Sequence, residues 1–123
     1  MKFVTDRKRA LGIGSAKSGT AHFREMKRSS VALLFLIPFF VFTLGSVIGE
    51  THEVVVTYFA KPFPALVTAL TIIFGFGHFK SGAAVLIGDY VHGTTSNLLI
   101  VSVNCVSYLA MAIGLFALAK MIF

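Results

Sequence analysis

The chain has 123 residues, which is enough for one domain at most. A hydrophobic content of 56%, a charged content of only 13% and a mean hydropathy of +0.86 exclude a soluble domain of this size. The formal net charge is +6, and eight of the eleven Lys and Arg residues lie in the segment 1–28. The composition therefore predicts an integral membrane protein with one strongly basic flank.

The segment 1–28 is predicted to be an extended basic arm on the cytoplasmic side of the membrane. Because an apolar span follows it directly, its charge is typical of a positive-inside flank, and we expect no nucleic-acid partner. The segment is too long for the basic part of a signal peptide, and the apolar run after it is long enough to span. Its G-x-G at 12–14 lacks the preceding strand and the Gly-Lys-Ser/Thr ending of a phosphate-binding loop.

The remainder, 29–123, is predicted to be an all-α membrane domain with three spanning helices. Its apolar segments cover about 30–48, 64–87 and 97–123, and each is near or above the ~20 residues that a spanning helix needs. Pro38 lies in the middle of the first and should kink it. With the basic arm inside, three spans place the first loop outside, the second loop inside and the C-terminus outside.

The second span contains a histidine, His78, about ten residues from its cytoplasmic end. An ionisable side chain at this depth is a functional hypothesis by default. Gly75 and Gly82 lie one turn away on roughly the same face and would leave room for a macrocycle against the helix. A neutral imidazole is a common haem ligand, although the second axial ligand would have to come from another chain. The pattern equally allows a histidine hydrogen-bonded between closely packed helices.

The connection after this span, "GDYVHGTTS", carries an acidic and an aromatic residue at the expected cytoplasmic surface. Gly88 and Gly93 predict the end of the second helix. Tyr90 lies 12 residues after His78, about 18 Å along a regular helix, and so near the headgroups, where belt tyrosines are common. The functional alternative is that its hydroxyl donates a hydrogen bond to a quinone carbonyl, while Asp89 holds or tunes that hydroxyl.

Three further side chains have simpler interpretations. Lys80 points about 200° round the helix from His78, where it can snorkel or meet a group on a partner protein. Arg28 closes the basic arm, where it can anchor the chain at the membrane surface or pair with a haem propionate. Cys105 is the single cysteine and lies in an apolar span, so we interpret it as a packing residue.

The spacing H-x10-DYVHG, which runs from His78 to Gly93 after two spans, resembles the small membrane-anchor subunits of succinate dehydrogenase, respiratory complex II. The glycine one turn after the histidine also matches. The segment "LGIGSAKSGTAHFREMKRSSVAL" is similar to the N-terminal arm of the alphaproteobacterial type. The resemblance covers about 11–123 and includes the order of the three spans.

This resemblance implies a b-type haem shared with a second membrane-anchor subunit. In it, His78 is the iron ligand from this chain, Arg28 lies near the propionates and Gly82 packs against the macrocycle. It also implies a ubiquinone site in which Tyr90 donates a hydrogen bond and Asp89 supports the site.

The resemblance further implies a subunit of succinate:ubiquinone oxidoreductase that has no catalytic site of its own. The expected partners are a second membrane-anchor subunit, an iron–sulfur subunit, a flavoprotein subunit and membrane lipid. The expected location is the bacterial cytoplasmic (inner) membrane, with a multi-pass topology, a cytoplasmic N-terminus and a periplasmic C-terminus.

Two other functions can be weighed against this one. A small transporter or ion-pathway protein could use His78 and Lys80 as relay groups, but it predicts an inverted repeat or a second polar helix, and neither is visible in the sequence. A haem-free structural anchor predicts that His78→Ala leaves the absorbance spectrum of the assembled complex unchanged.

Overall fold

The computed structural model describes residues 3–12 and 18–123, and within these ranges it contains only helices, turns and irregular segments. They form α1 (Asp6–Leu11), α2 (Ser18–Gly45), α3 (His52–Phe59), α4 (Pro62–Tyr90) and α5 (Thr94–Ile122). The predicted all-α class is therefore confirmed. Most of the G-x-G at 12–14 lies outside the described residues.

The three predicted spans are also confirmed. Among the described residues, three helical segments are long and apolar enough to cross a membrane, and they cover Phe23–Gly45, Pro62–Tyr90 and Thr94–Ile122. Pro38 lies inside α2, as predicted, and the helix continues past it to Gly45. A proline removes one backbone donor, and a membrane helix tolerates this loss where its neighbours satisfy the freed carbonyl.

The N-terminal arm differs from the extended segment that the sequence predicted. Part of it is helical: α1 forms near the start, and α2 begins ten residues before the predicted boundary at 28. In α1, Asp6 lies in the first turn and Lys8 and Arg9 in the last, which complements the helix dipole. Within 21–28, Ala, Arg, Glu, Met and Lys are good helix formers, so the span continues backward into the basic segment.

The helix bounds at the second connection also differ from the prediction. Gly88 does not end α4, because the backbone N–H of Val91 still donates to the Ile87 carbonyl at 2.8 Å. The helix ends at Tyr90, because Val91 has an extended backbone with φ −120° and ψ 130°. Gly93 follows just before α5, and its φ of 75° is in the left-handed region that favours glycine. The helix α5 then begins directly after it at Thr94, three residues earlier than predicted.

The first connection contains the short helix α3, which the sequence pattern did not indicate. Phe59 of α3 is buried and packs in a small apolar cluster with Val47, after α2, and Leu118 of α5. Burial of these side chains favours the helix in a segment whose β-branched residues have low helix propensity. The cluster ties the ends of the spans together at this side of the molecule.

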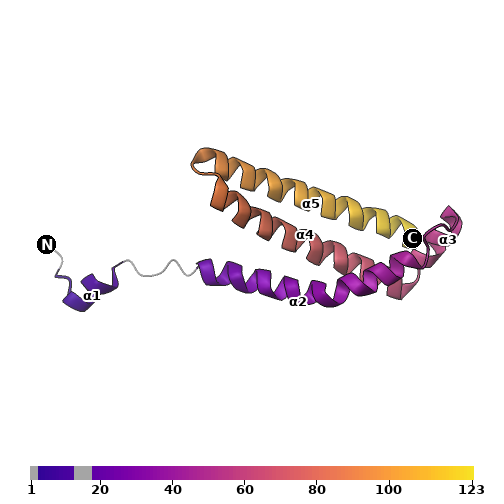
Figure 1. The fold of residues 1–123 in the computed structure, drawn as a ribbon, viewed down its shortest axis with the longest axis horizontal. Helices are drawn as coiled ribbons and strands as arrows, with labels where there is room; N and C mark the ends of the chain where they lie inside the picture. Colours follow the sequence, from indigo (N-terminus) through magenta and orange to yellow (C-terminus); the bar gives the residue numbers. More distant parts are fainter. Residues whose placement is uncertain (1–2, 13–17) are drawn as a thin grey trace.

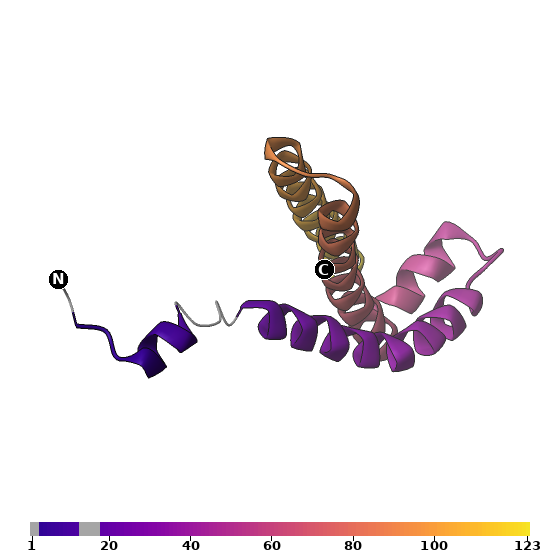
Figure 2. The same cartoon turned by 60° about the vertical axis from the view of Figure 1, so that its left-hand side comes forward.

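The helix α4 is the centre of the arrangement. It packs against both α2 and α5, whereas α2 and α5 do not pack on each other in the described part of the chain (Figure 1). The N-terminal end of α2 and the connection between α4 and α5 lie at one end of the molecule, and α3 and the C-terminus lie at the other (Figure 1). Toward its N-terminal end, α2 diverges from the pair formed by α4 and α5 (Figure 2).

The spans expose many large apolar side chains, including Phe35, Phe42, Leu86 and Phe116. A soluble surface would not tolerate so much contiguous apolar area, but lipid tails and apolar partner helices cover it without cost. Fold and composition therefore agree on a multi-pass membrane protein.

The helices α4 and α5 approach each other closely at Gly114. A Cβ at this position would lie 3.3 Å from Cδ1 of Ile72. We expect Gly114→Val to destabilise the helix pair by about 1–3 kcal/mol, because the added methyl groups have no room and the branched Ile72 must shift. The measurement is the thermal stability of the purified protein in detergent or nanodiscs.

Gly88→Val is the matched control, since a Cβ there meets nothing within 4 Å and both variants place the same β-branched residue in a helix. Equal losses in the two variants would show that Gly114 does not mediate close packing.

Candidate functional site

The candidate site is organised by α4, which is continuous from Pro62 to Tyr90. Because the helix is unbroken, His78, Gly82 and Asp89 follow one face at intervals of four and seven residues, as the sequence predicted. Tyr90 ends the same helix. The site residues of this helix therefore share one rigid element, with the histidine inside the span and the tyrosine at its end.

The imidazole of His78 is half-buried and is held by α2. Its Nδ1 lies 3.0 Å from Oγ of Ser29, which is hydrogen-bond distance. Ser29 also donates a hydrogen bond from its hydroxyl to the carbonyl oxygen of Met26, at 2.8 Å. Among the described residues, Nε2 of His78 makes no hydrogen bond. Nδ1 of the ring is thus within hydrogen-bond distance of Ser29, whereas Nε2 makes no hydrogen bond to the described residues.

The flank of α4 beside His78 is open. Apart from the backbone of their own helix, Cβ atoms at Gly75 and Gly82 would meet no heavy atom of the described chain within 4 Å. Gly75, but neither Gly82 nor His78, belongs to the lining of an apolar cavity of about 430 Å³, whose lining residues are Phe40, Thr71, Ile72, Gly75, Phe76 and Phe79. The surface of α4 at these two glycines therefore has room for at least one further atom at each position.

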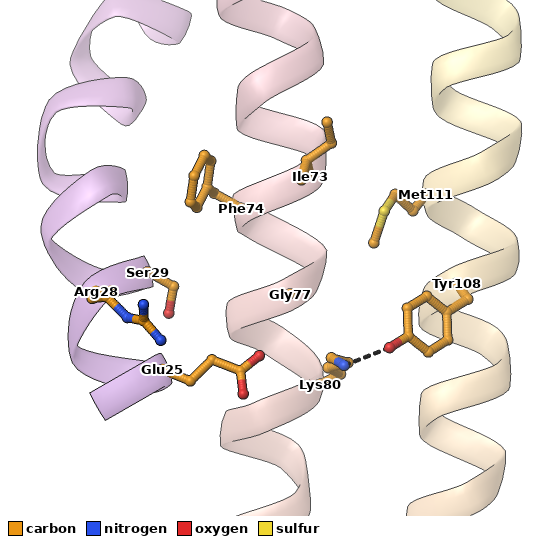
Figure 3. A pocket seen from close by; sticks show the side chains of 9 residues that line it. All are labelled: Glu25, Arg28, Ser29, Ile73, Phe74, Gly77, Lys80, Tyr108 and Met111. Carbon is orange, nitrogen blue, oxygen red and sulfur yellow. Dashed lines mark hydrogen bonds between the residues drawn. The ribbon is translucent and has the colours of Figure 1, made fainter. Parts of the chain in front are cut away.

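A second cavity, of about 380 Å³, lies where α2, α4 and α5 meet (Figure 3). Its lining residues are Glu25, Arg28, Ser29, Ile73, Phe74, Gly77, Lys80, Tyr108 and Met111. It contrasts with the first cavity because three charged side chains from two helices contribute to it. Figure 3 shows the Arg28 guanidinium and the Glu25 carboxylate on the α2 side, and Lys80 on the α5 side.

Lys80 contacts a side chain of the same protein, Tyr108. Its ammonium donates a hydrogen bond to the hydroxyl of Tyr108 at 2.6 Å and lies 4.7 Å from the centroid of the same ring (Figure 3). Both contacts lower the cost of keeping a lysine at this depth. From the sequence, Lys80 was expected to snorkel or to meet a group on a partner protein. In the structure it contacts a residue of α5 in the same chain.

Asp89 and Tyr90 lie at the C-terminal end of α4, at the end of the molecule that also holds the N-terminal end of α2 (Figure 1). Arg28 is exposed and directly precedes Ser29, so its backbone is near the level of His78. Asp89 is exposed, and 80% of the Tyr90 surface is accessible. The structure does not bring Tyr90 to His78, since 12 residues of helix, about 18 Å, separate them. Arg28 and His78 therefore form one candidate site, and Asp89 and Tyr90 form a second one.

The described residues contain no group of three or more His, Cys, Asp and Glu side chains that could hold a metal ion. Cys105 is exposed and free of any disulfide. Two contact residues, Ser29 and Tyr108, had no predicted role. The signal available in the sequence was only that each is a polar group within an apolar span.

Comparison with known proteins identifies the family. Residues 1–119 match the family described as succinate dehydrogenase/fumarate reductase transmembrane subunit. The succinate dehydrogenase hydrophobic membrane anchor subunit of Paracoccus denitrificans is 40% identical over 121 residues, which cover 98% of this chain and 94% of that protein. No solved structure matches the chain. With its three spanning helices, the chain therefore belongs to the family of succinate dehydrogenase and fumarate reductase transmembrane subunits.

Proposed function

We propose that this chain is the membrane anchor of a succinate:ubiquinone oxidoreductase, that it supplies one axial ligand of a b-type haem, and that it forms part of the ubiquinone site. The observation that carries the haem role is the environment of His78. Its imidazole lies inside a spanning helix, is fixed through Nδ1 by Ser29 and has an open, apolar flank.

The residues around His78 fit a flat macrocycle. Gly75 and Gly82 leave the flank of α4 free, and the neighbouring cavity is lined almost entirely by apolar side chains. When bound, haem supplies a one-electron redox centre. The chain's own contributions are the Nε2 lone pair of His78, the space at Gly82 and a low-dielectric surrounding. Since the chain offers one ligand, the other comes from the second membrane-anchor protein of the complex.

We assign Arg28 to the haem propionates. A guanidinium forms bidentate, charge-assisted hydrogen bonds with a carboxylate, and this one directly precedes the residue that holds His78. Lys80 is a less suitable partner because its side chain lies on the α5 side of α4, away from Ser29, and contacts Tyr108 (Figure 3).

We assign Tyr90 to ubiquinone. Its hydroxyl lies at the end of α4, exposed and free to donate a hydrogen bond to a quinone carbonyl. Asp89 precedes it, is also exposed and supports the site by orienting the hydroxyl or by pairing with a cation of a partner protein. The head group would bind between this helix end and the iron–sulfur subunit.

The charge distribution supports the sidedness that this function requires. The basic arm lies at the same end of the molecule as Tyr90, and the positive-inside rule places that end in the cytoplasm (Figure 1). The flavoprotein and iron–sulfur subunits would dock there, and the C-terminus would face the periplasm. The membrane is the bacterial inner membrane.

The test uses the native complex, purified through an affinity tag on the C-terminus of this chain. We expect three partner proteins to co-purify, succinate to reduce ubiquinone, and a b-type signal to appear in the reduced-minus-oxidised spectrum. A complex that has full activity but no b-type signal would be a haem-free anchor. Recovery of the chain without the other proteins would overturn the anchor role.

A further inference from the structure

The hydroxyl of Ser29 makes two contacts at hydrogen-bond distance with a single hydrogen. One contact is to the carbonyl oxygen of Met26, at 2.8 Å, and the other is to Nδ1 of His78, at 3.0 Å. A carbonyl oxygen can only accept, so a hydrogen bond between Ser29 and Met26 requires the hydroxyl hydrogen. The reverse assignment would leave two oxygens facing each other at 2.8 Å with no hydrogen between them, which is repulsive.

The hydrogen in the second contact must therefore come from His78. A neutral imidazole carries one N–H, and if Nδ1 has it, Nε2 keeps its lone pair. This tautomer is the one that can ligate a metal through Nε2, and among the described residues no hydrogen bond competes for that nitrogen. The opposite tautomer would place the hydrogen on Nε2 and remove the lone pair that a metal needs.

We infer that Ser29 is a positioning residue for His78: it selects the Nδ1–H tautomer, fixes the ring and presents Nε2 as the metal ligand. This inference rests on the proposed haem role of His78. The hydrogen bond also has an electronic consequence, because an imidazole that donates through its second nitrogen is a more basic ligand. A more basic ligand stabilises the ferric state and lowers the reduction potential.

The chain provides a matched control in the next residue. The hydroxyl of Ser30 also donates to the Met26 carbonyl, at 2.9 Å, but Ser30 is exposed and, in the described part of the chain, makes no hydrogen bond to His78. Replacing either serine removes one hydroxyl from the same helical turn. Only the Ser29 change removes the group that accepts from Nδ1.

The experiment compares the purified wild-type complex with Ser29→Ala, Ser30→Ala and Ser29→Thr. The readouts are the haem reduction potential, from a redox titration, and haem retention, from transfer of haem to apomyoglobin. For Ser29→Ala we expect a more positive potential and haem loss about tenfold faster. Ser30→Ala should match the wild type, and Ser29→Thr should restore both values because its hydroxyl can make the same bonds.

The outcomes separate this inference from the proposed function. A wild-type b-type signal with unchanged potential and retention in Ser29→Ala overturns the role of Ser29 and leaves the function standing. Equal shifts in Ser29→Ala and Ser30→Ala also overturn it, since they would reflect a general effect on the helix. A wild type without haem overturns both. If Ser29→Ala fails to assemble, Ser29→Cys, similar in size but a weak acceptor, must show the positive shift for the inference to hold.

Discussion

Replacement of His78 by alanine is expected to abolish the b-type signal in the reduced-minus-oxidised spectrum of the purified complex. Among the described residues, His78 is the only histidine within a candidate span, so the substitution would remove the haem ligand proposed from this chain. Haem that has lost an axial ligand dissociates or changes spin state, and either result removes the low-spin b-type bands. The measurement is the difference spectrum, normalised to the flavin content of each preparation.

His52→Ala is the matched control for this substitution. His52 is exposed at the start of α3, in the connection between the first two spans, and far along the chain from the open flank of α4. Its spectrum should equal that of the wild type. An unchanged signal in His78→Ala would assign both axial ligands to other residues and would remove the central element of the proposed site. A flavin content that falls in parallel with haem would indicate lost assembly instead of a lost ligand.

Those features of the fold that depend on one segment at a time could be predicted from the sequence. The three spans were predicted because each is an uninterrupted apolar run, and a helix must satisfy its backbone hydrogen bonds internally in lipid. The same constraint explains why α4 extends beyond the predicted end. Gly88 has a weak helix propensity, but interrupting the backbone hydrogen bonds costs more, so the helix continues to Tyr90 and ends where Val91 adopts an extended backbone.

The segments outside the spans were predicted less well. The basic arm was expected to be extended, yet α2 continues into it. Polar and charged residues disfavour burial in the membrane, but they do not prevent a helix from forming. The helix α3 was missed because Val54, Val55 and Val56 favour strands by local propensity. Its stability comes from packing of Phe59 against side chains distant in sequence, and such contacts are not visible in a local pattern.

For the candidate site too, relations within one helix could be predicted and contacts between helices could not. The relation of His78 to Gly82 and Tyr90 follows from the period of one helix and was predicted. The contacts between Ser29 and His78, and between Lys80 and Tyr108, join different helices across 49 and 28 residues of sequence. They depend on how far one helix is shifted and rotated against the next, which no spacing within a helix determines. The resemblance to a known family suggested roles for residues on single helices and none for Ser29.

Replacement of Tyr90 by phenylalanine is expected to separate two activities that the wild-type complex couples. The change removes one hydroxyl from a side chain that is 80% exposed, and among the described residues this hydroxyl makes no hydrogen bond. Assembly and the reduction of a soluble dye by succinate should therefore stay at wild-type levels. Ubiquinone reduction should fall about tenfold, because a lost hydrogen bond to the substrate costs roughly 1.4 kcal/mol.

Tyr58→Phe is the matched control, since it removes the same hydroxyl from a half-buried tyrosine of α3 at the opposite end of the molecule (Figure 1). Both activities should be unaffected in that variant. Because dye reduction bypasses the quinone, a selective loss of ubiquinone reduction in Tyr90→Phe would link the hydroxyl to the quinone step and not to succinate oxidation. Unaltered ubiquinone reduction would exclude a direct role and would leave Tyr90 as an interfacial belt residue.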